Sequence, residues 1–330
     1  MFVTSDIFDL EQVASNWGVA GWRERLVGGI AIHGTDWPGG KAAARFLIEA
    51  AKVCDLQDQL PAAGYSIQWG EPSEHLDFAG LADLARGALS DGSAATSVYL
   101  EGSQGSVNTY DYVRYGGWLD AAPRMVAAPG NAIVPNYPFR AFDGDFGFPL
   151  DGVGVERAEA LLRLAAEVLE ADYGYFFVRD VLAGANFYAR AQPAKSLGSD
   201  RLARADALES TLWRKFVGEG ELWTGPWPQL RDIFAVNLLS TRHMTDYIEP
   251  IGYLHEWITA EPGRGRLKYA AEGRVLWTLT DAEIHAVRPA MWDSVSMRSC
   301  MPRVYRDLPY ARQRPDPETA RHVNDRISGT

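Results

Sequence analysis

Apolar and polar positions alternate with two different periods along the first hundred residues. Short apolar runs predict strands over 27–33, 65–69 and 95–101. Between them, apolar residues at helical spacing predict helices over 41–57 and 76–89. This strand–helix–strand order is typical of an α/β layer.

The pattern changes between residues 102 and 151. This segment is rich in Gly, Pro and Asn and carries many aromatic residues. Long connections without regular structure are uncommon unless they are functional or act as linkers, and disordered segments are poor in aromatics. We therefore expect an irregular but packed segment that serves partly as a connection.

Regular periodicity returns at a helix predicted over 155–171. The run 173–178 is apolar on both faces, which indicates a central or doubly covered strand. A weaker helix is predicted over 203–217 and a strand over 232–236. Ser240 is a candidate cap for a short helix that follows it.

The pattern over 267–279 predicts a hairpin, with strands at 267–269 and 275–279. Directly after it, Thr280 and Glu283 have the spacing of a capping box, which predicts a helix over 281–292.

These elements predict an α+β (or α/β) protein made of two loosely similar mixed-sheet lobes with helices packed on the sheets. The predicted division is an N-terminal α/β lobe over 1–120, an aromatic and Gly/Pro-rich connection over 121–154, and a C-terminal α+β lobe over 155–300. Residues 301–330 form an Arg- and Pro-containing tail.

The net charge of −11 is concentrated in the first part of the chain. Residues 1–200 contain 26 acidic and 14 basic side chains, whereas residues 201–330 contain 17 and 18. Nucleic-acid binders need Lys and Arg to neutralise phosphates, so the acidity argues against that class. It is compatible with a basic protein partner.

Several sequence features bear on location. No apolar run approaches the about 20 residues needed to cross a bilayer. The first residues lack a signal peptide's basic and apolar regions. Cys54 and Cys300 are far apart and outside any Cys-x-x-Cys motif. We expect a reduced, cytoplasmic protein that does not contact a membrane.

No cofactor motif is complete. The segment 34–41 resembles a phosphate-binding loop between a strand and a helix, but an extra glycine displaces Lys41 and Ala42 stands where a Ser or Thr would bind magnesium. Gly152 and Gly154 match only part of a dinucleotide fingerprint. We therefore expect no cofactor.

No metal-binding or hydrolase motif is complete either. The six histidines form no His-x-x-x-His pair, and no Gly-x-Ser-x-Gly elbow occurs. Asp143, Asp145 and Asp151 resemble the start of a calcium loop, but Gly154 occupies the position of the closing Glu. We interpret these aspartates as solvated turn residues or as an acidic loop that contacts a partner, and expect no metal.

Tryptophan is unusually frequent, and six of the eleven tryptophans lie between residues 213 and 292. Most are expected to be core anchors, because each buries a large apolar area. Trp223 and Trp227 lie beside prolines, where neither a helix nor a strand is predicted. Together with Trp118 in the aromatic-rich segment, they are candidates for a binding surface, where tryptophan is enriched.

Two segments of the last third, 230–243 and 276–288, resemble uncharacterised bacterial proteins that we associate with the immunity proteins of polymorphic toxin systems. The resemblance rests on no catalytic motif. It implies a cytoplasmic protein that binds and neutralises a cognate toxin domain. An acidic first part of the chain would complement a basic toxin.

The leading hypothesis is therefore a non-enzymatic binding protein, immunity-like, that occludes a partner. Its expected contact residues are Asp143, Asp145, Asp151, Trp118, Trp223 and Trp227. The alternative is a hydrolase or transferase whose active site is assembled from residues distant in sequence. The sequence does not specify an oligomeric state.

Overall fold

A computed structural model describes most of the chain between residues 26 and 292. The described residues are 26–56, 62–67, 74–89, 95–104, 113–127, 133–150, 153–180, 188–189, 213, 230–248 and 250–292.

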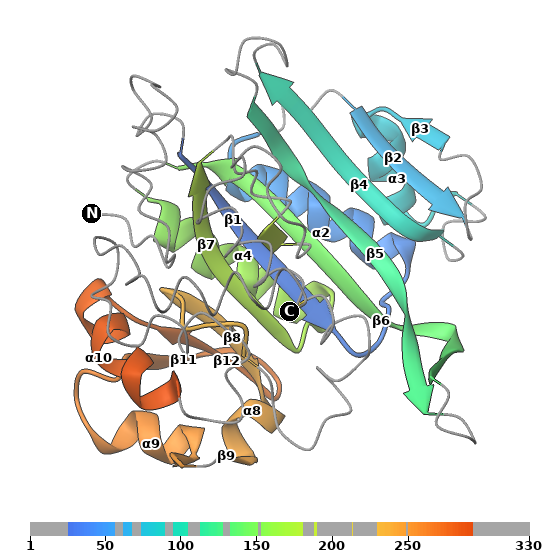
Figure 1. The fold of residues 1–330 in the computed structure, drawn as a ribbon. Helices are drawn as coiled ribbons and strands as arrows, with labels where there is room; N and C mark the ends of the chain where they lie inside the picture. The colour runs from blue at the N-terminus through green and yellow to red at the C-terminus, as the bar shows by residue number, and fades with distance from the viewer. Residues whose placement is uncertain are drawn as a thin grey trace, which may run out of the picture.

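The described strands form one ten-stranded sheet, with the strand order β11-β12-β8-β7-β1-β6-β5-β4-β2-β3, and a separate two-stranded sheet (Figure 1). All paired strands run antiparallel. The strands of the large sheet are β1 (Leu26–Gly34), β2 (Ala62–Ile67), β3 (Glu74–Leu76), β4 (Ala95–Gln104), β5 (Val113–Ala127), β6 (Ile133–Pro149), β7 (Tyr173–Asp180), β8 (Val236–Ser240), β11 (Arg266–Ala271) and β12 (Arg274–Thr278). The small sheet pairs β9 (Tyr247–Ile248) with β10 (Gly252–Tyr253).

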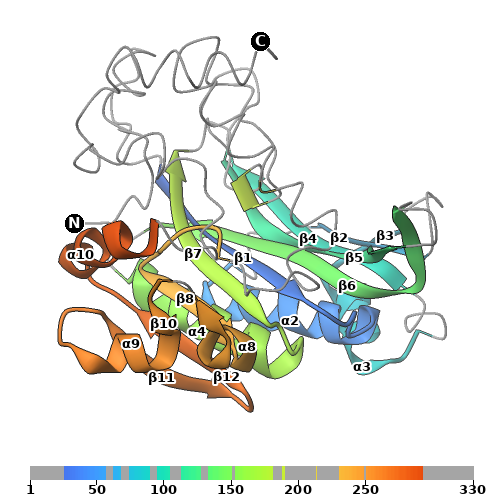
Figure 2. The same cartoon turned by 60° about the horizontal axis from the view of Figure 1, so that its bottom comes forward.

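The helices lie mainly against the sheet. They are α2 (Gly40–Val53), α3 (Phe78–Arg86), α4 (Gly154–Val168), α8 (Thr241–Thr245), α9 (Leu254–Ala260) and α10 (Asp281–Trp292). Helices α2, α3 and α4 cover the same face of the large sheet (Figure 2). We call it the helix face.

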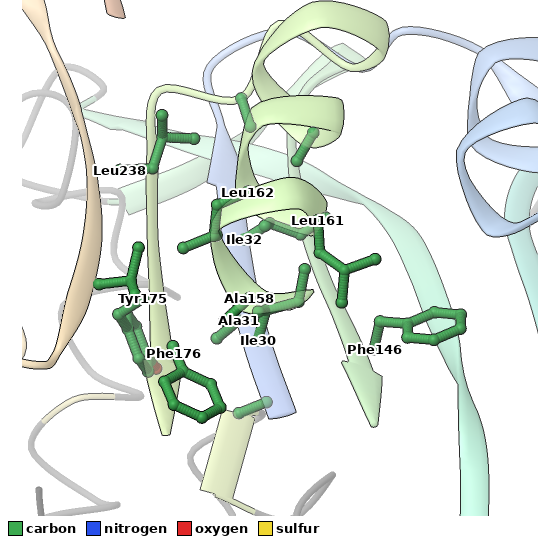
Figure 3. Packing of buried hydrophobic residues seen from close by; sticks show 14 of the residues in the cluster. Ile30, Ala31, Ile32, Phe146, Ala158, Leu161, Leu162, Tyr175, Phe176 and Leu238 are labelled. Atoms are coloured by element: carbon green, nitrogen blue, oxygen red, sulfur yellow. The ribbon is translucent and has the colours of Figure 1, made fainter. Parts of the chain in front are cut away.

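The core lies between the helix face and these helices. Leu161 and Leu162 of α4 are fully buried and pack over Ile30 and Ile32 of β1 (Figure 3). Phe146 of β6 extends the same layer toward α2, where its ring meets Phe46 edge-on at 6.5 Å. Burial of aliphatic and aromatic side chains of this size is the main driving force for folding.

The structure confirms the α+β class and most of the predicted elements. The run 173–178 is part of β7, which lies between β1 and β8 as its two apolar faces required. The capping box is also present, since Glu283 accepts hydrogen bonds from the backbone N–H and hydroxyl of Thr280. Ser240 is the N-cap of α8 in a second capping box, where His243 Nδ1 accepts a hydrogen bond from the Ser240 backbone N–H at 3.3 Å.

The prediction of an irregular segment over 102–151 is wrong, because β5 and β6 occupy most of it. Glycines in these strands leave room for bulky neighbours. For example, a Cβ on Gly117 would lie 2.6 Å from a ring carbon of Phe146. A Gly-rich composition therefore marks close packing within a sheet here.

The strand predicted over 232–236 is also misplaced, since β8 begins at Val236. The residues before it bond locally instead of joining the ladder. Asp232 Oδ1 accepts from the Ile233 N–H at 2.7 Å, and Asn237 Oδ1 accepts from the Phe234 N–H at 3.1 Å. Such side-chain bonds compete with regular structure. The helix predicted over 203–217 and the tail 301–330 lie outside the described residues, apart from Trp213.

The division into two lobes stays a prediction, but the sheet is continuous across it. β1, from the first predicted lobe, pairs on one side with β6 and on the other with β7 from the second. Within the described residues, no helix combines the length and the apolar character needed to span a bilayer.

Candidate functional site

The face of the sheet opposite the helices carries a row of polar side chains. The strand register aligns Ser97 of β4, Asp120 of β5, Asp143 of β6, His33 of β1 and Tyr173 of β7. Residues directly opposite each other on neighbouring strands have their side chains on the same face of a sheet, so these five side chains share one face. We call them the polar row.

The orientation of the polar row follows from its neighbours in sequence. A Cβ on Gly174 would point at Leu162 of α4, and a Cβ on Gly144 would point at Ile32 in the core. Since these glycines face the helices, Tyr173 and Asp143 face away from them.

One contact in the row joins His33 and Asp143. His33 Nδ1 lies 2.6 Å from Asp143 Oδ1, and the two side chains are 2% and 36% exposed. His33 is packed between rings: it stacks on Tyr173 at 5.8 Å and meets Trp213 edge-on at 5.8 Å. Its Nε2 is buried and has no hydrogen-bond partner among the described residues.

This geometry assigns the hydrogen of the imidazole. A carboxylate can only accept a hydrogen bond, so Nδ1 carries a hydrogen and donates the hydrogen bond to Asp143. The hydrogen-bond partner of one ring nitrogen determines which of the two nitrogens carries the hydrogen. The pair therefore consists of an imidazole held by aromatic rings and a carboxylate that reaches solvent.

A second anchored carboxylate lies next to the first. Asp120 accepts a hydrogen bond from Ser97 Oγ at 2.5 Å and another from Trp118 Nε1. Trp118 is half-buried on the same face, with its ring centroid 5.2 Å from that of Tyr99. Asp120 therefore lies at the edge of an aromatic pair.

Asp120 and Asp143 are directly opposite each other on neighbouring strands. Like charges in this relation repel and lower stability. Each carboxylate is nevertheless held by hydrogen-bond donors, which keeps the two negative groups side by side. Asp145 follows on the same face of β6, opposite Trp118, and is only 2% exposed.

A buried aromatic cluster supports the His33 end of the row. Tyr173 OH accepts from the Arg231 N–H at 2.8 Å, and Arg231 NH1 donates to Tyr175 OH at 2.7 Å. The Arg231 guanidinium lies 3.6 Å over the ring of Tyr188, a cation–π contact. Burial raises the pKa of Tyr173 well above its ordinary value, and the nearby Tyr175 adds to the effect. Tyr173 therefore remains a neutral packing element below His33.

The structure places three of the six expected contact residues. Asp143, Asp145 and Trp118 lie on one face of adjacent strands, where Trp118 and Asp145 are cross-strand neighbours. The interpretation of Asp143 and Asp145 as turn residues is wrong, because both lie within β6. Asp151, Trp223 and Trp227 lie outside the described residues.

The sequence interpretation missed His33, Ser97 and Asp120 as members of this site. One local signal was present: in Asp143-Gly144-Asp145 the two acids are two residues apart, the period of a strand, so they share a face. No local signal paired them with His33, which is 110 residues away.

The arrangement presents negative charge beside a half-buried aromatic pair. A general base must reach the proton that it removes. In this structure the Nε2 atom of His33 is buried, so it is closed to a substrate proton. The described residues include no group of three or more His, Cys, Asp or Glu side chains arranged to hold a metal ion.

No protein-family model matches the chain, and no curated protein matches it significantly. Among solved structures, the chain is similar to the Pseudomonas aeruginosa T6SS protein PA0821, with a TM-score of 0.41 and 12% sequence identity. The similarity covers 77% of this chain and 64% of that protein, so the chain spans less than two thirds of its length. A likeness of this size assigns neither a function nor a partner.

Proposed function

We propose that the chain is a binding protein and that the face carrying the polar row is its contact surface for a partner with cationic side chains. The observation that carries the proposal is the cross-strand pair Asp120–Asp143, in which two anchored carboxylates lie side by side. A partner's Lys or Arg placed near both would relieve their mutual repulsion. Charge complementarity of this kind gives specificity and speeds association.

The aromatic pair beside these carboxylates supports the same proposal. Trp118 and Tyr99 are both half-buried, so part of each residue is open to solvent. Tryptophan and tyrosine are enriched among residues that dominate binding energy, and a cation over an aromatic face is favourable. A basic side chain could contact the rings and Asp120 together.

Two features of the sequence support the kind of partner that we propose. The resemblance of the last third to immunity proteins implies a toxin domain, and the excess of acidic residues in 1–200 suits a basic one. We therefore propose an immunity-like role in which this chain binds a basic toxin domain and blocks it sterically.

The test is the affinity for the protein encoded by the adjacent gene, measured by calorimetry at low and raised ionic strength. Asp143→Asn removes the charge while its amide oxygen can still accept from His33. We expect binding at least about tenfold weaker, or about 1.4 kcal/mol, with a smaller salt dependence.

A matched control is Asp83→Asn on α3. Asp83 is exposed and pairs with Arg86, and its helix, α3, lies on the opposite side of the sheet (Figure 2). Its removal should leave the affinity unchanged. Equal affinities for the wild type and Asp143→Asn would contradict the proposed surface, and the absence of a salt-sensitive complex would contradict the proposed partner.

The alternative, a hydrolase or transferase, would use His33 as a base oriented by Asp143, since that hydrogen bond is one found in catalytic triads. The burial of His33 Nε2 disfavours it. Turnover of an ester or amide substrate that is lost in His33→Asn would favour the enzyme.

A further inference from the structure

We propose that His33 is a positioning residue for partner binding: it holds one carboxylate oxygen of Asp143 so that the other is presented at the surface. This inference rests on the proposed function and adds a role for a residue that cannot itself touch the partner. His33 is 2% exposed, whereas Asp143 is 36% exposed.

The register explains why this contact is fixed. His33 and Asp143 are directly opposite each other on β1 and β6. Because both strands lie in the interior of the ten-stranded sheet, their backbones are held on both sides. The 2.6 Å bond from Nδ1 then fixes the side-chain rotation of Asp143.

The imidazole is itself prevented from turning. It stacks on Tyr173 at 5.8 Å and on Tyr175 at 6.1 Å, and the edge of Trp213 closes a further side. Tyr173 is held from below by His243, whose ring stacks on it at 5.4 Å. A half-turn of the imidazole would put a carbon against Asp143 and lose the hydrogen bond.

Fixing Asp143 before binding matters because an immobilised side chain loses conformational entropy when a complex forms. This loss is a recognised cost of association, and a group that is already ordered avoids most of it. His33 therefore affects affinity through the order of Asp143, without a contact of its own.

Two substitutions separate this role from packing. His33→Phe keeps an aromatic ring between Tyr173 and Trp213 but removes the donor. His33→Asn removes the ring, but its amide nitrogen can occupy the position of Nδ1 and donate to Asp143. The measurement is the affinity for the protein encoded by the adjacent gene, together with the urea midpoint of the free chain.

We expect His33→Phe to bind about two- to tenfold more weakly than the wild type, which corresponds to the ordering of one side chain. His33→Asn should bind within about twofold of the wild type despite a lower urea midpoint, because the cavity left by the ring costs stability. If His33 has a purely structural role, affinity should instead follow the urea midpoint, and His33→Asn should bind more weakly than His33→Phe.

A measurement on the free wild-type chain keeps the proposal falsifiable if either variant does not fold. Nitrogen-15 NMR of the His33 ring should show a proton on Nδ1. A proton on Nε2 alone would overturn the inference.

The outcomes distinguish this inference from the proposed function. If Asp143→Asn binds as well as the wild type, the surface itself is wrong. If Asp143→Asn binds weakly and His33→Phe binds normally, the surface stands and the positioning role of His33 is overturned.

Discussion

Gly144 provides a sharp test of the strand that carries the site. It lies between Asp143 and Asp145 in β6, and its backbone is outside the left-handed region. In a solvated turn, alanine would be tolerated at such a position. In the structure, a Cβ on Gly144 would lie too close to Leu119 Cδ2 and 3.0 Å from Ile32 Cγ1, both in the core.

The size of the effect follows from this crowding. Adding a methyl group to a filled core costs about 1–3 kcal/mol, because neighbouring side chains must leave their preferred rotamers. Leu119→Ala alone should cost about 2–5 kcal/mol through the cavity that it leaves. In the double variant the new methyl group enters that cavity, so the double variant should cost no more than Leu119→Ala.

The assay is urea unfolding of the four chains in this double-mutant cycle, followed by far-UV circular dichroism. We expect a favourable coupling of at least about 1 kcal/mol between Gly144→Ala and Leu119→Ala. Leu84→Ala in α3 is the control: Leu84 is fully buried but does not contact the added Cβ, so its effect should add to that of Gly144→Ala. A Gly144→Ala chain as stable as the wild type would refute the packing described for β6.

Two further predictions concern buried groups away from the polar row. Arg288→Met should lower the free energy of unfolding by about 3–5 kcal/mol, because Arg288 is buried and its Nε donates to Asp232 at 2.9 Å, so the substitution leaves a buried carboxylate without this partner. The control is Arg86→Met, which breaks an exposed pair with Asp83 and should change the urea midpoint little. Burial raises the pKa of the Tyr173 hydroxyl in the folded chain. The contribution of the neutral hydroxyl to the free energy of unfolding is therefore complete below pH 10, the ordinary pKa of tyrosine, and is lost as the pH rises above that value. The stability difference between the wild type and Tyr173→Phe should therefore shrink above that pH, and a constant difference would contradict the assigned burial.

The sequence was sufficient for elements with a strong local period. The strand over 27–33, the helix at α4 and the hairpin β11–β12 were predicted because their apolar spacing is set by residues close in the chain. β5 and β6 were missed because their glycines, which accommodate large neighbouring rings, have the composition of a loop. Local propensity does not report this kind of tertiary packing.

The candidate site was only partly accessible to sequence reasoning. Asp143, Asp145 and Trp118 were selected from composition and motif, without knowledge that they share a face. The partnership of His33 with Asp143 depends on the pairing of β1 with β6, which lies in sheet topology and register. The sequence carries no local record of which distant strands pair.

The most direct test of the central claim is carboxylate footprinting of the chain with and without the protein encoded by the adjacent gene. A carbodiimide and an amine label accessible carboxylates, and mass spectrometry locates the modified residues. We predict that Asp143 and Asp120 are labelled in the free chain and protected in the complex. Asp83 on α3 and Asp55, which is exposed just after the end of α2, should be labelled equally in both. Protection of Asp83 with continued labelling of Asp143 would place the partner on the helix face and contradict the account.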